Sequence, residues 1–330
     1  MIWTLAGTTA AAALLAVSYY FSERVLRIPT HKTEAILAHE LERGSVTRER
    51  LDELPKEEFA IDSPFGYKLH AWFVPADGEA TGRTVAFAHG VTSSSYGMVK
   101  YADLFLRRGF NVVLYDHRRH GRSGGDFTTY GYYEKRDPKA VVDWAYERFG
   151  RDAVVGVFGE SMGAATALQF AAMDRRPAFV VADCPYSDLT EQLAYRLKME
   201  FRLPRFPLLP ITSLWCKLRA GFFFREVSPV RDSASIAAPV LLIHGREDDY
   251  VPPWMSEAVY ERLTGTKSMY VAPDAAHAES WARGRESYER ELDAFLRSLG
   301  LLRGAAESRA EDATMDPAKD AAGGTRPGRG

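Results

Sequence analysis

The sequence predicts an α/β protein with a doubly wound, mostly parallel sheet, a small helical cap insertion and an N-terminal hydrophobic helix. From about residue 83, short apolar runs of strand length alternate with longer helix-forming runs. Such alternation is typical of a parallel sheet covered by helices on both faces, with its ligand site at the carboxyl ends of the strands. Residues 188–229 interrupt the alternation, and residues 1–21 carry no charged side chain. These two segments predict the cap and the N-terminal helix.

The uncharged run 1–21 is long enough, at roughly 1.5 Å per residue, to cross a bilayer as a helix. No Lys or Arg precedes Arg24, whereas a signal peptide normally begins with positive charge. We therefore expect an uncleaved anchor in the cell membrane, with a cleaved signal peptide or a hydrophobic arm as the alternatives. Arg24 and Arg27 follow the run, so the positive-inside tendency favours the cytoplasmic side for the rest of the chain.

After this run, residues 22–55 are charged and helix-permissive and predict a helical stalk. Two alternating runs around the turn-forming SPFG then predict an antiparallel hairpin. One domain is expected over 56–299, with strands at RTVAFAHG, FNVVLYD, VVGVF, PAFVVADCPY, APVLLIHG and KSMYVAP. Helices are expected between these strands, at YGMVKYADLFLRRG, DPKAVVDWAYERFG, residues 162–170 and about 253–263, and at the end of the domain through residue 299.

The interrupting segment 188–229 contains LPRFPLLPITSLWCKLRAGFFF, which is rich in proline and large apolar residues. A surface loop would expose these side chains, so a small helical cap over the strand ends is the better interpretation. Residues 302–330 are rich in Ala, Gly, Arg and Asp and predict a disordered tail.

Composition excludes several classes of function. The chain has 330 residues, 46% of them hydrophobic, and a formal net charge of −2, which gives no reason to expect a nucleic-acid partner. Its two cysteines, Cys184 and Cys216, are too few for a disulfide framework and lack metal-ligand spacing. We expect both to be buried small apolar side chains, and we expect no cofactor or metal.

A serine stands at the junction of a predicted strand and a predicted helix in VVGVFGESMGAATAL, residues 154–168. Gly159 and Gly163 flank Ser161 and let the backbone turn without a Cβ clash, which leaves the hydroxyl exposed at the carboxyl end of the strand. This G-x-S-x-G pattern predicts a nucleophile elbow. Because the pattern also occurs by chance, companion residues must decide whether it is functional.

A serine nucleophile needs a base and a carboxylate that orients the base, in the chain order Ser, acid, His. His277, in the loop after the last predicted strand, is the one histidine beyond the candidate acids. The acid is expected in REDDYVPP, where Glu247, Asp248 and Asp249 compete. We favour Asp248, the third residue after the strand, because it is far enough along to turn back towards His277.

The tetrahedral intermediate of acyl transfer needs two N–H groups aimed at its oxygen. One is expected from Met162, which follows the nucleophile, and the other from Val91 in the HGVTSSS loop after the first parallel strand. His89 in that loop and His244 in the strand before the acid are interpreted as structural.

Strand, elbow, helix, acid and a lone downstream histidine in this order resemble the α/β-hydrolase superfamily over roughly residues 56–299. YDHRRHGRSGG is similar to that superfamily's D-x-R-G-H-G-x-S turn, with Arg119 where glycine is usual. With HGVTSSS, TTYGYYEK, GESMGA, DCPYSDL and HGREDDYVP, the chain looks closest to membrane-anchored bacterial hydrolases related to serine aminopeptidase-like and acyl-transferase-like members. Asp183 precedes the usual acid loop and is treated as structural.

The leading hypothesis is a serine hydrolase that cleaves carboxylic esters through an acyl-enzyme, with medium apolar acyl groups preferred because the cap is apolar. A peptidase or a thioesterase would use the same acyl-enzyme intermediate, so both activities remain alternatives. A haloalkane-dehalogenase-like mechanism is disfavoured because its nucleophile would be a carboxylate. A non-catalytic, membrane-tethered binding protein is the alternative of another class. The expected partners are a small-molecule ester and, through the N-terminal helix, a membrane.

Overall fold

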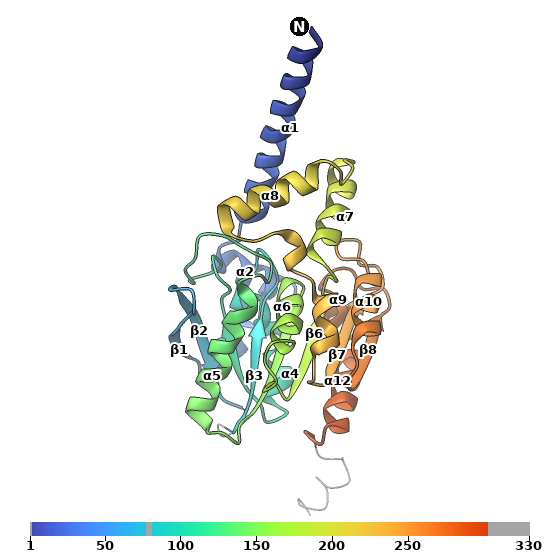
Figure 1. The fold of residues 1–330 in the computed structure, drawn as a ribbon. Coiled ribbons are helices and arrows are strands. Elements are labelled where there is room, and N and C mark those ends of the chain that lie inside the picture. Colours follow the sequence, from blue (N-terminus) through green and yellow to red (C-terminus); the bar gives the residue numbers. More distant parts are fainter. Residues whose placement is uncertain (1, 77–80, 303–330) are drawn as a thin grey trace, which may run out of the picture. The chain divides into compact units, whose positions relative to one another are not determined.

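The computed structural model describes residues 2–76 and 81–302 and contains an eight-stranded sheet in the order β1-β2-β4-β3-β5-β6-β7-β8 (Figure 1). Pairs β1–β2 and β2–β4 are antiparallel, and the pairs from β4 to β8 are parallel. The strands are β1 (Glu57–Asp62), β2 (Lys68–Val74), β3 (Arg83–Ala88), β4 (Asn111–Tyr115), β5 (Val154–Glu160), β6 (Phe179–Asp183), β7 (Val240–Gly245) and β8 (Lys267–Ala272). The predicted mostly parallel sheet and its leading hairpin are therefore confirmed.

The helices connect these strands in the expected alternation. They are α1 (Ile2–Leu26), α2 (Thr33–Glu42), α3 (Arg48–Glu53), α4 (Ala102–Leu106), α5 (Asp137–Phe149), α6 (Met162–Ala171), α7 (Leu189–Phe201), α8 (Leu208–Ala220), α9 (Pro229–Asp232), α10 (Trp254–Arg262), α11 (Ser280–Arg283) and α12 (Arg285–Ser298). The chain divides into two compact units with the boundary after Tyr288, so the active-site elements described below all belong to the first unit.

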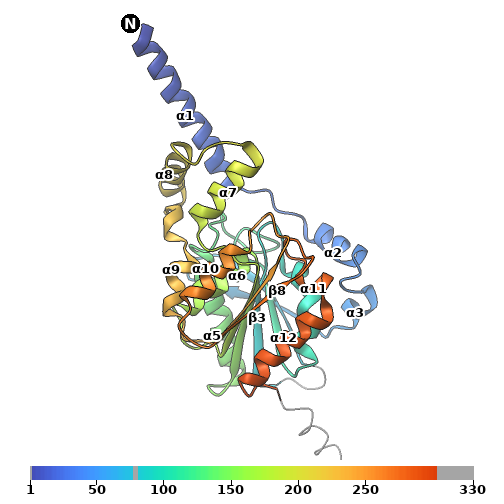
Figure 2. The ribbon, with the colours of Figure 1, turned by 90° about the vertical axis from the view of Figure 1, so that its right-hand side faces the viewer.

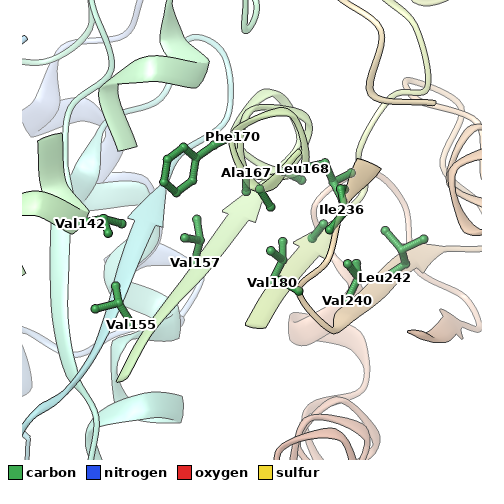
Figure 3. Packing of buried hydrophobic residues seen from close by; sticks show 14 of the residues in the cluster. Val142, Val155, Val157, Ala167, Leu168, Phe170, Val180, Ile236, Val240 and Leu242 are labelled. Atoms are coloured by element: carbon green, nitrogen blue, oxygen red, sulfur yellow. The ribbon is translucent and has the colours of Figure 1, made fainter. Parts of the chain in front are cut away.

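The period-two alternation of β5 separates two apolar layers. Val155 and Val157 belong to an apolar cluster that is drawn in Figure 3. The helices α5, α6 and α10, which contribute residues to this cluster, lie on the same side of the sheet (Figure 2). Phe158 points to the opposite face, where its ring lies 5.2 Å from that of Phe87 and 5.7 Å from that of Phe105 in α4. Because both faces are buried, β5 carries a nearly continuous apolar run, as expected of a central parallel strand.

The N-terminal segment is helical, but the prediction of a membrane-spanning anchor over 1–21 is not supported. Nowhere in the described part of the chain does a helix combine the length and apolar character that crossing a membrane requires. Small and hydroxylated residues such as Thr8, Thr9 and Ser18 dilute the apolar character of α1. The C-terminal half of α1 contacts α8 instead (Figures 1 and 2).

Between β6 and β7 the chain inserts α7 and α8, where the sequence predicts a helical cap. Their side chains form an apolar cluster together with Val25 and Leu26 at the end of α1. The predicted stalk consists of the end of α1 followed by α2 and α3. The predicted disordered tail lies, after its first residue, outside the described residues.

Candidate active site

Ser161 stands at a tight turn between β5 and α6. Its backbone has φ +56° and ψ −116°, a conformation that a non-glycine residue adopts only where the surrounding structure enforces it. The flanking glycines are required by close packing, because a Cβ on Gly159 would collide with the backbone of Gly163 and a Cβ on Gly163 would collide with that of Ala88. The turn therefore holds the hydroxyl at the carboxyl end of β5, where Ser161 is only 6% exposed.

Two hydrogen bonds join Ser161 to a carboxylate from a distant loop. Nε2 of His277 lies 2.9 Å from Oγ of Ser161, and Nδ1 of His277 lies 2.6 Å from Oδ2 of Asp248. Because an ionised carboxylate can only accept, Nδ1 carries the hydrogen and Nε2 is left to accept the serine proton. His277 follows β8 and Asp248 follows β7, so the fold brings together the three side chains that the sequence selects.

The carboxylate of Asp248 is buried and held from two sides. Its Oδ1 accepts the backbone N–H groups of Tyr250 at 2.9 Å and Val251 at 2.8 Å. Its Oδ2 lies 3.1 Å from Nε2 of His244, besides its bond to His277. Burial by itself raises the pKa of Asp248, but the hydrogen bonds from His244 and His277 outweigh it and lower the pKa to about 2. The group is therefore ionised across the neutral range.

The loop after β3 is held in a strained turn beside the serine. Thr92 has φ +67°, and its N–H donates to Nε2 of His120 at 3.2 Å. Val91 in this loop lines the same cavity as Ser161 and Met162. Met162 is the first residue of α6, so its N–H has no partner within the helix and is free for an oxyanion. Both predicted oxyanion-hole residues thus line the cavity that contains Ser161.

His89 and His244, interpreted from the sequence as structural, are both fully buried and hydrogen-bonded. Nδ1 of His89 lies 2.7 Å from the carbonyl oxygen of Gly90, and Nε2 accepts the N–H of His117 at 2.9 Å. Burial lowers the pKa of His89, so the ring stays neutral and shapes the loop. His244 also contacts the catalytic-site carboxylate, a role that its place in an apolar strand did not reveal.

The cap helix α7 is fastened to the loop that carries the acid. Gln192 donates to the carbonyl oxygen of Tyr250 at 2.8 Å, and Arg196 donates to that of Asp249 at 3.2 Å. The guanidinium of Arg196 lies 4.1 Å from the Tyr250 ring centroid, and that ring lies 4.9 Å from the ring of His277. Movement of α7 would therefore disturb the position of the base.

A cavity of about 290 Å³ opens beside Ser161, close to the lower end of the usual range for ligand pockets. Its wall is mainly apolar, and three helices supply much of it: Leu189, Leu193 and Leu197 of α7, Leu209 of α8, and Phe21 and Val25 of α1. The cap predicted over 188–229 therefore lines the cavity mainly through α7 rather than α8, and α1, which lies outside the predicted cap, also contributes more than α8 does.

Within residues 2–76 and 81–302, one group of side chains has the spacing of metal ligands. Ligand atoms of Cys184, Asp248 and His277 lie within 4.8 Å of one another. The latter two are hydrogen-bonded to each other, and burial raises the pKa of the Cys184 thiol far above its ordinary value. A buried, protonated thiol is a poor ligand, so this group does not fit a metal.

Asp183 at the end of β6 is fully buried and takes no direct part in the serine network. Its carboxyl accepts the hydroxyl of Tyr288 at 3.1 Å and that of Ser280 at 3.3 Å. Burial, with the nearby charge of Glu160, raises its pKa to about 7. Its backbone oxygen accepts the N–H of Ser161 at 2.8 Å, which supports the elbow.

Comparison with known proteins agrees with this architecture. YqkD of Bacillus subtilis, an uncharacterized protein, is 41% identical over 290 residues, which are 87% of this chain and 94% of that protein. The Pyrococcus furiosus esterase Pf2001 has 28% sequence identity and a TM-score of 0.63, with 77% of this chain and 94% of that chain covered. The chain belongs to the α/β-hydrolase superfamily.

Two further matches show how wide this α/β-hydrolase group is. A model of the X-Pro dipeptidyl-peptidase (S15) family matches residues 74–213. An alpha/beta hydrolase domain-containing protein of Arabidopsis thaliana, WAV2, is 25% identical over 277 residues, 81% of this chain and 85% of that protein. The relatives thus include both esterase and peptidase types.

For an α/β-hydrolase, the contribution of α1 to the cavity is the feature that sequence reasoning missed. The sequence predicts a bilayer anchor over 1–21 and, after it, a stalk with no role at the site. Phe21 and Val25 line the same cavity as Ser161, although they are about 140 residues away along the chain. No local pattern in the sequence signals which surface an apolar helix will cover.

Proposed function

We propose that this α/β-hydrolase is a serine hydrolase that cleaves carboxylic esters through an acyl-enzyme. The observation that carries the proposal is the 2.9 Å contact between Oγ of Ser161, held at φ +56°, and Nε2 of His277. A hydroxyl is a weak nucleophile until a neighbouring base removes its proton. Here the base has an unprotonated nitrogen at that hydroxyl and a carboxylate behind its other nitrogen.

In the first half-reaction Oγ of Ser161 attacks the ester carbonyl while Nε2 of His277 takes the hydroxyl proton. Asp248 stabilises the resulting imidazolium through Nδ1. The carbonyl oxygen becomes an oxyanion that accepts the N–H groups of Met162 and Val91. When the tetrahedral intermediate collapses, the bond to the alcohol oxygen breaks and His277 gives that oxygen its proton.

In the second half-reaction water replaces the alcohol. His277 removes a proton from the water, the resulting oxygen attacks the acyl carbon, and a second oxyanion forms in the same place. Collapse releases the carboxylic acid and returns the proton to Ser161. The low pKa of Asp248 keeps the carboxylate ionised in both halves.

The apolar wall of the cavity supports apolar acyl groups as substrates. Burying an apolar chain contributes about 0.8 kcal/mol per methylene, whereas a charged chain would lose hydration against the apolar part of this wall. The size of the cavity favours acyl chains of medium length over very long ones.

A fluorophosphonate probe tests the mechanism without assuming a substrate. We expect covalent labelling of the wild type and none of Ser161→Ala, with the modified residue identified by mass spectrometry. An unlabelled wild type would favour the alternative of a non-catalytic binding protein. A p-nitrophenyl ester series from acetyl to palmitoyl then measures the acyl preference, with its maximum expected at intermediate length.

A peptidase is the second candidate, because the S15 family model matches residues 74–213. A peptidase that recognises the amino terminus of a peptide needs a carboxylate for the ammonium group. Among the described residues that line the cavity, the one carboxylate is Glu200, and Arg196 donates to it at 2.6 Å. Faster cleavage of an Xaa-Pro-p-nitroanilide than of any ester would nevertheless reverse the order of the two candidates.

A further inference from the structure

The end of α1 lies in the wall of the cavity that contains the serine. Phe21, Val25 and Ile28 line this cavity together with Ser161, and Val25 is 8% exposed. Val25 also packs in the apolar cluster that holds Met162, the residue next to the nucleophile. The helix therefore meets the cap and the elbow at once.

Hydrogen bonds from four separate parts of the domain hold this segment in place. Arg219 of α8 donates to Oγ of Ser22 at 2.8 Å and also to the carboxylate of Glu23. The backbone oxygen of Leu26 accepts the N–H of Thr128 at 2.9 Å, and the backbone oxygen of Ile28 accepts from the guanidinium of Arg119 at 2.7 Å. The N–H of His31 donates to the backbone oxygen of Thr92 at 3.0 Å. The last of these bonds joins the segment to the strained loop beside the oxyanion site. A segment with this many separate attachments has a defined position against the cavity.

Arg119 explains the one departure from the superfamily pattern. It stands at φ +63°, a conformation that glycine adopts without strain and arginine does not. Its guanidinium reaches the carbonyl oxygen of Ile28, a bond that glycine could not make. The arginine therefore accepts local strain at a turn and attaches the N-terminal segment to the domain.

We propose that residues 21–28 form a specificity-determining wall of the substrate site, with Val25 limiting the room for an apolar acyl chain between α1 and α7. The proposal rests on the serine-hydrolase function above and adds to it the element that selects the chain. Leu193 and Leu197 of α7 line the same cavity as Val25. Chain selectivity then depends on a segment outside the cap and outside the hydrolase sheet.

The test compares methyl and dodecyl p-nitrophenyl alkylphosphonates, which modify Ser161 whichever acyl substrate the enzyme prefers. The ratio of the two modification rate constants is measured in the wild type, Val25→Trp, Val25→Ala and Val17→Trp. Val17 is the matched control, since it is in the same helix, is 44% exposed and does not line the cavity.

We expect Val25→Trp to lower the dodecyl-to-methyl ratio about tenfold, the effect of denying burial to roughly two methylenes. Val25→Ala should raise the ratio severalfold, and Val17→Trp should leave both rate constants unchanged. Opposite shifts from the two Val25 variants separate a wall from a folding defect, which would slow both probes alike.

An unchanged ratio in both Val25 variants, with normal labelling of Ser161, would overturn the proposed wall and leave the serine-hydrolase function standing. An equal fall of the ratio in Val17→Trp would overturn it too, because the effect would then not come from the cavity. If neither probe modifies Ser161 in the wild type, the proposed function is wrong, and the proposed specificity-determining wall, which rests on it, is overturned as well.

Discussion

Replacing the carboxylate of Asp248 by an amide should move the hydrogen of the His277 imidazole from Nδ1 to Nε2. The N–H groups of Tyr250 and Val251 both donate to Oδ1, so the amide oxygen of Asp248→Asn must stay at that position. Its NH₂ group then replaces Oδ2 and donates to Nδ1 of His277. The imidazole hydrogen moves to Nε2, which can no longer accept the proton of Ser161.

The size of the effect follows from the cost of the opposite amide orientation. Flipping the amide would set its NH₂ against two backbone N–H donors, and each buried donor left without an acceptor costs about 1–3 kcal/mol. The productive orientation is therefore disfavoured by about 2–6 kcal/mol, or roughly 30-fold to 3 × 10⁴-fold in population. The same Asp→Asn substitution in the Ser-His-Asp triad of a serine protease lowers kcat by about 10⁴. We expect a loss in kcat of about 10³ or more for Asp248→Asn, with KM little changed.

The matched control is Asp249→Asn, one residue further along the same loop. Its side chain is exposed, and the contact that it makes with α7 uses its backbone oxygen, which the substitution keeps. Steady-state hydrolysis of the best p-nitrophenyl ester, with circular dichroism to check folding, should show Asp249→Asn within about twofold of wild type. If Asp248→Asn keeps more than a tenth of the wild-type kcat, or if Asp249→Asn is the more damaging change, the assignment of the acid is wrong.

Three further predictions use other parts of the structure. His277→Ala and Ser161→Ala should each lower ester turnover about 10³-fold or more, and the double variant should be no slower than the slower single variant. Near-wild-type turnover in His277→Ala would show that His277 is not the general base. Arg119→Gly should speed amide hydrogen exchange of residues 21–31 several-fold, because the bond to the oxygen of Ile28 is lost, and unchanged exchange would mean that this bond does not hold the segment. The folded-state pKa of Asp183 is about 7, above its ordinary value of 3.8. The free energy of unfolding of the wild type should therefore fall as the pH rises from about 4 to 7, by up to about 1.4 kcal/mol per pH unit. Urea midpoints at pH 5 and 8 should therefore differ less in Asp183→Asn than in the wild type, and an equal difference would show that Asp183 titrates normally.

Much of the site could be predicted because the turn at the nucleophile is encoded locally and the other two residues follow from the order of the strands. The glycines around Ser161 and the strand-to-helix transition lie within a few residues of the nucleophile, so local sterics alone indicate the turn. The acid and the histidine follow from chain order, since the carboxyl ends of neighbouring parallel strands meet at one edge of a sheet. The choice of Asp248 over Asp249 needed only the distance along the loop.

The contacts of His244 show where this kind of reasoning stops. Its position in β7 predicts a buried, hydrogen-bonded histidine, which the structure contains. Its approach to Oδ2 of Asp248 at 3.1 Å depends on how the next loop folds back over the strand. Loop conformation is decided by contacts with α7 and α10, which lie elsewhere in the chain.

The sequence by itself determined the elements, their order, and the residues offered to the carboxyl edge of the sheet, because these depend on short-range sterics and on hydrophobic periodicity. Only the tertiary structure decided what α1 covers. An apolar helix gains free energy from any apolar surface that removes it from water, and its own residues do not say whether that surface is a bilayer or a protein. Here the bonds from Arg219, Thr128 and Arg119, residues about 90 to 200 positions away, place the end of α1 against the cap and Ser161. That placement needed the whole fold, because the partners of α1 come from separate parts of the chain that are near one another only in the folded domain.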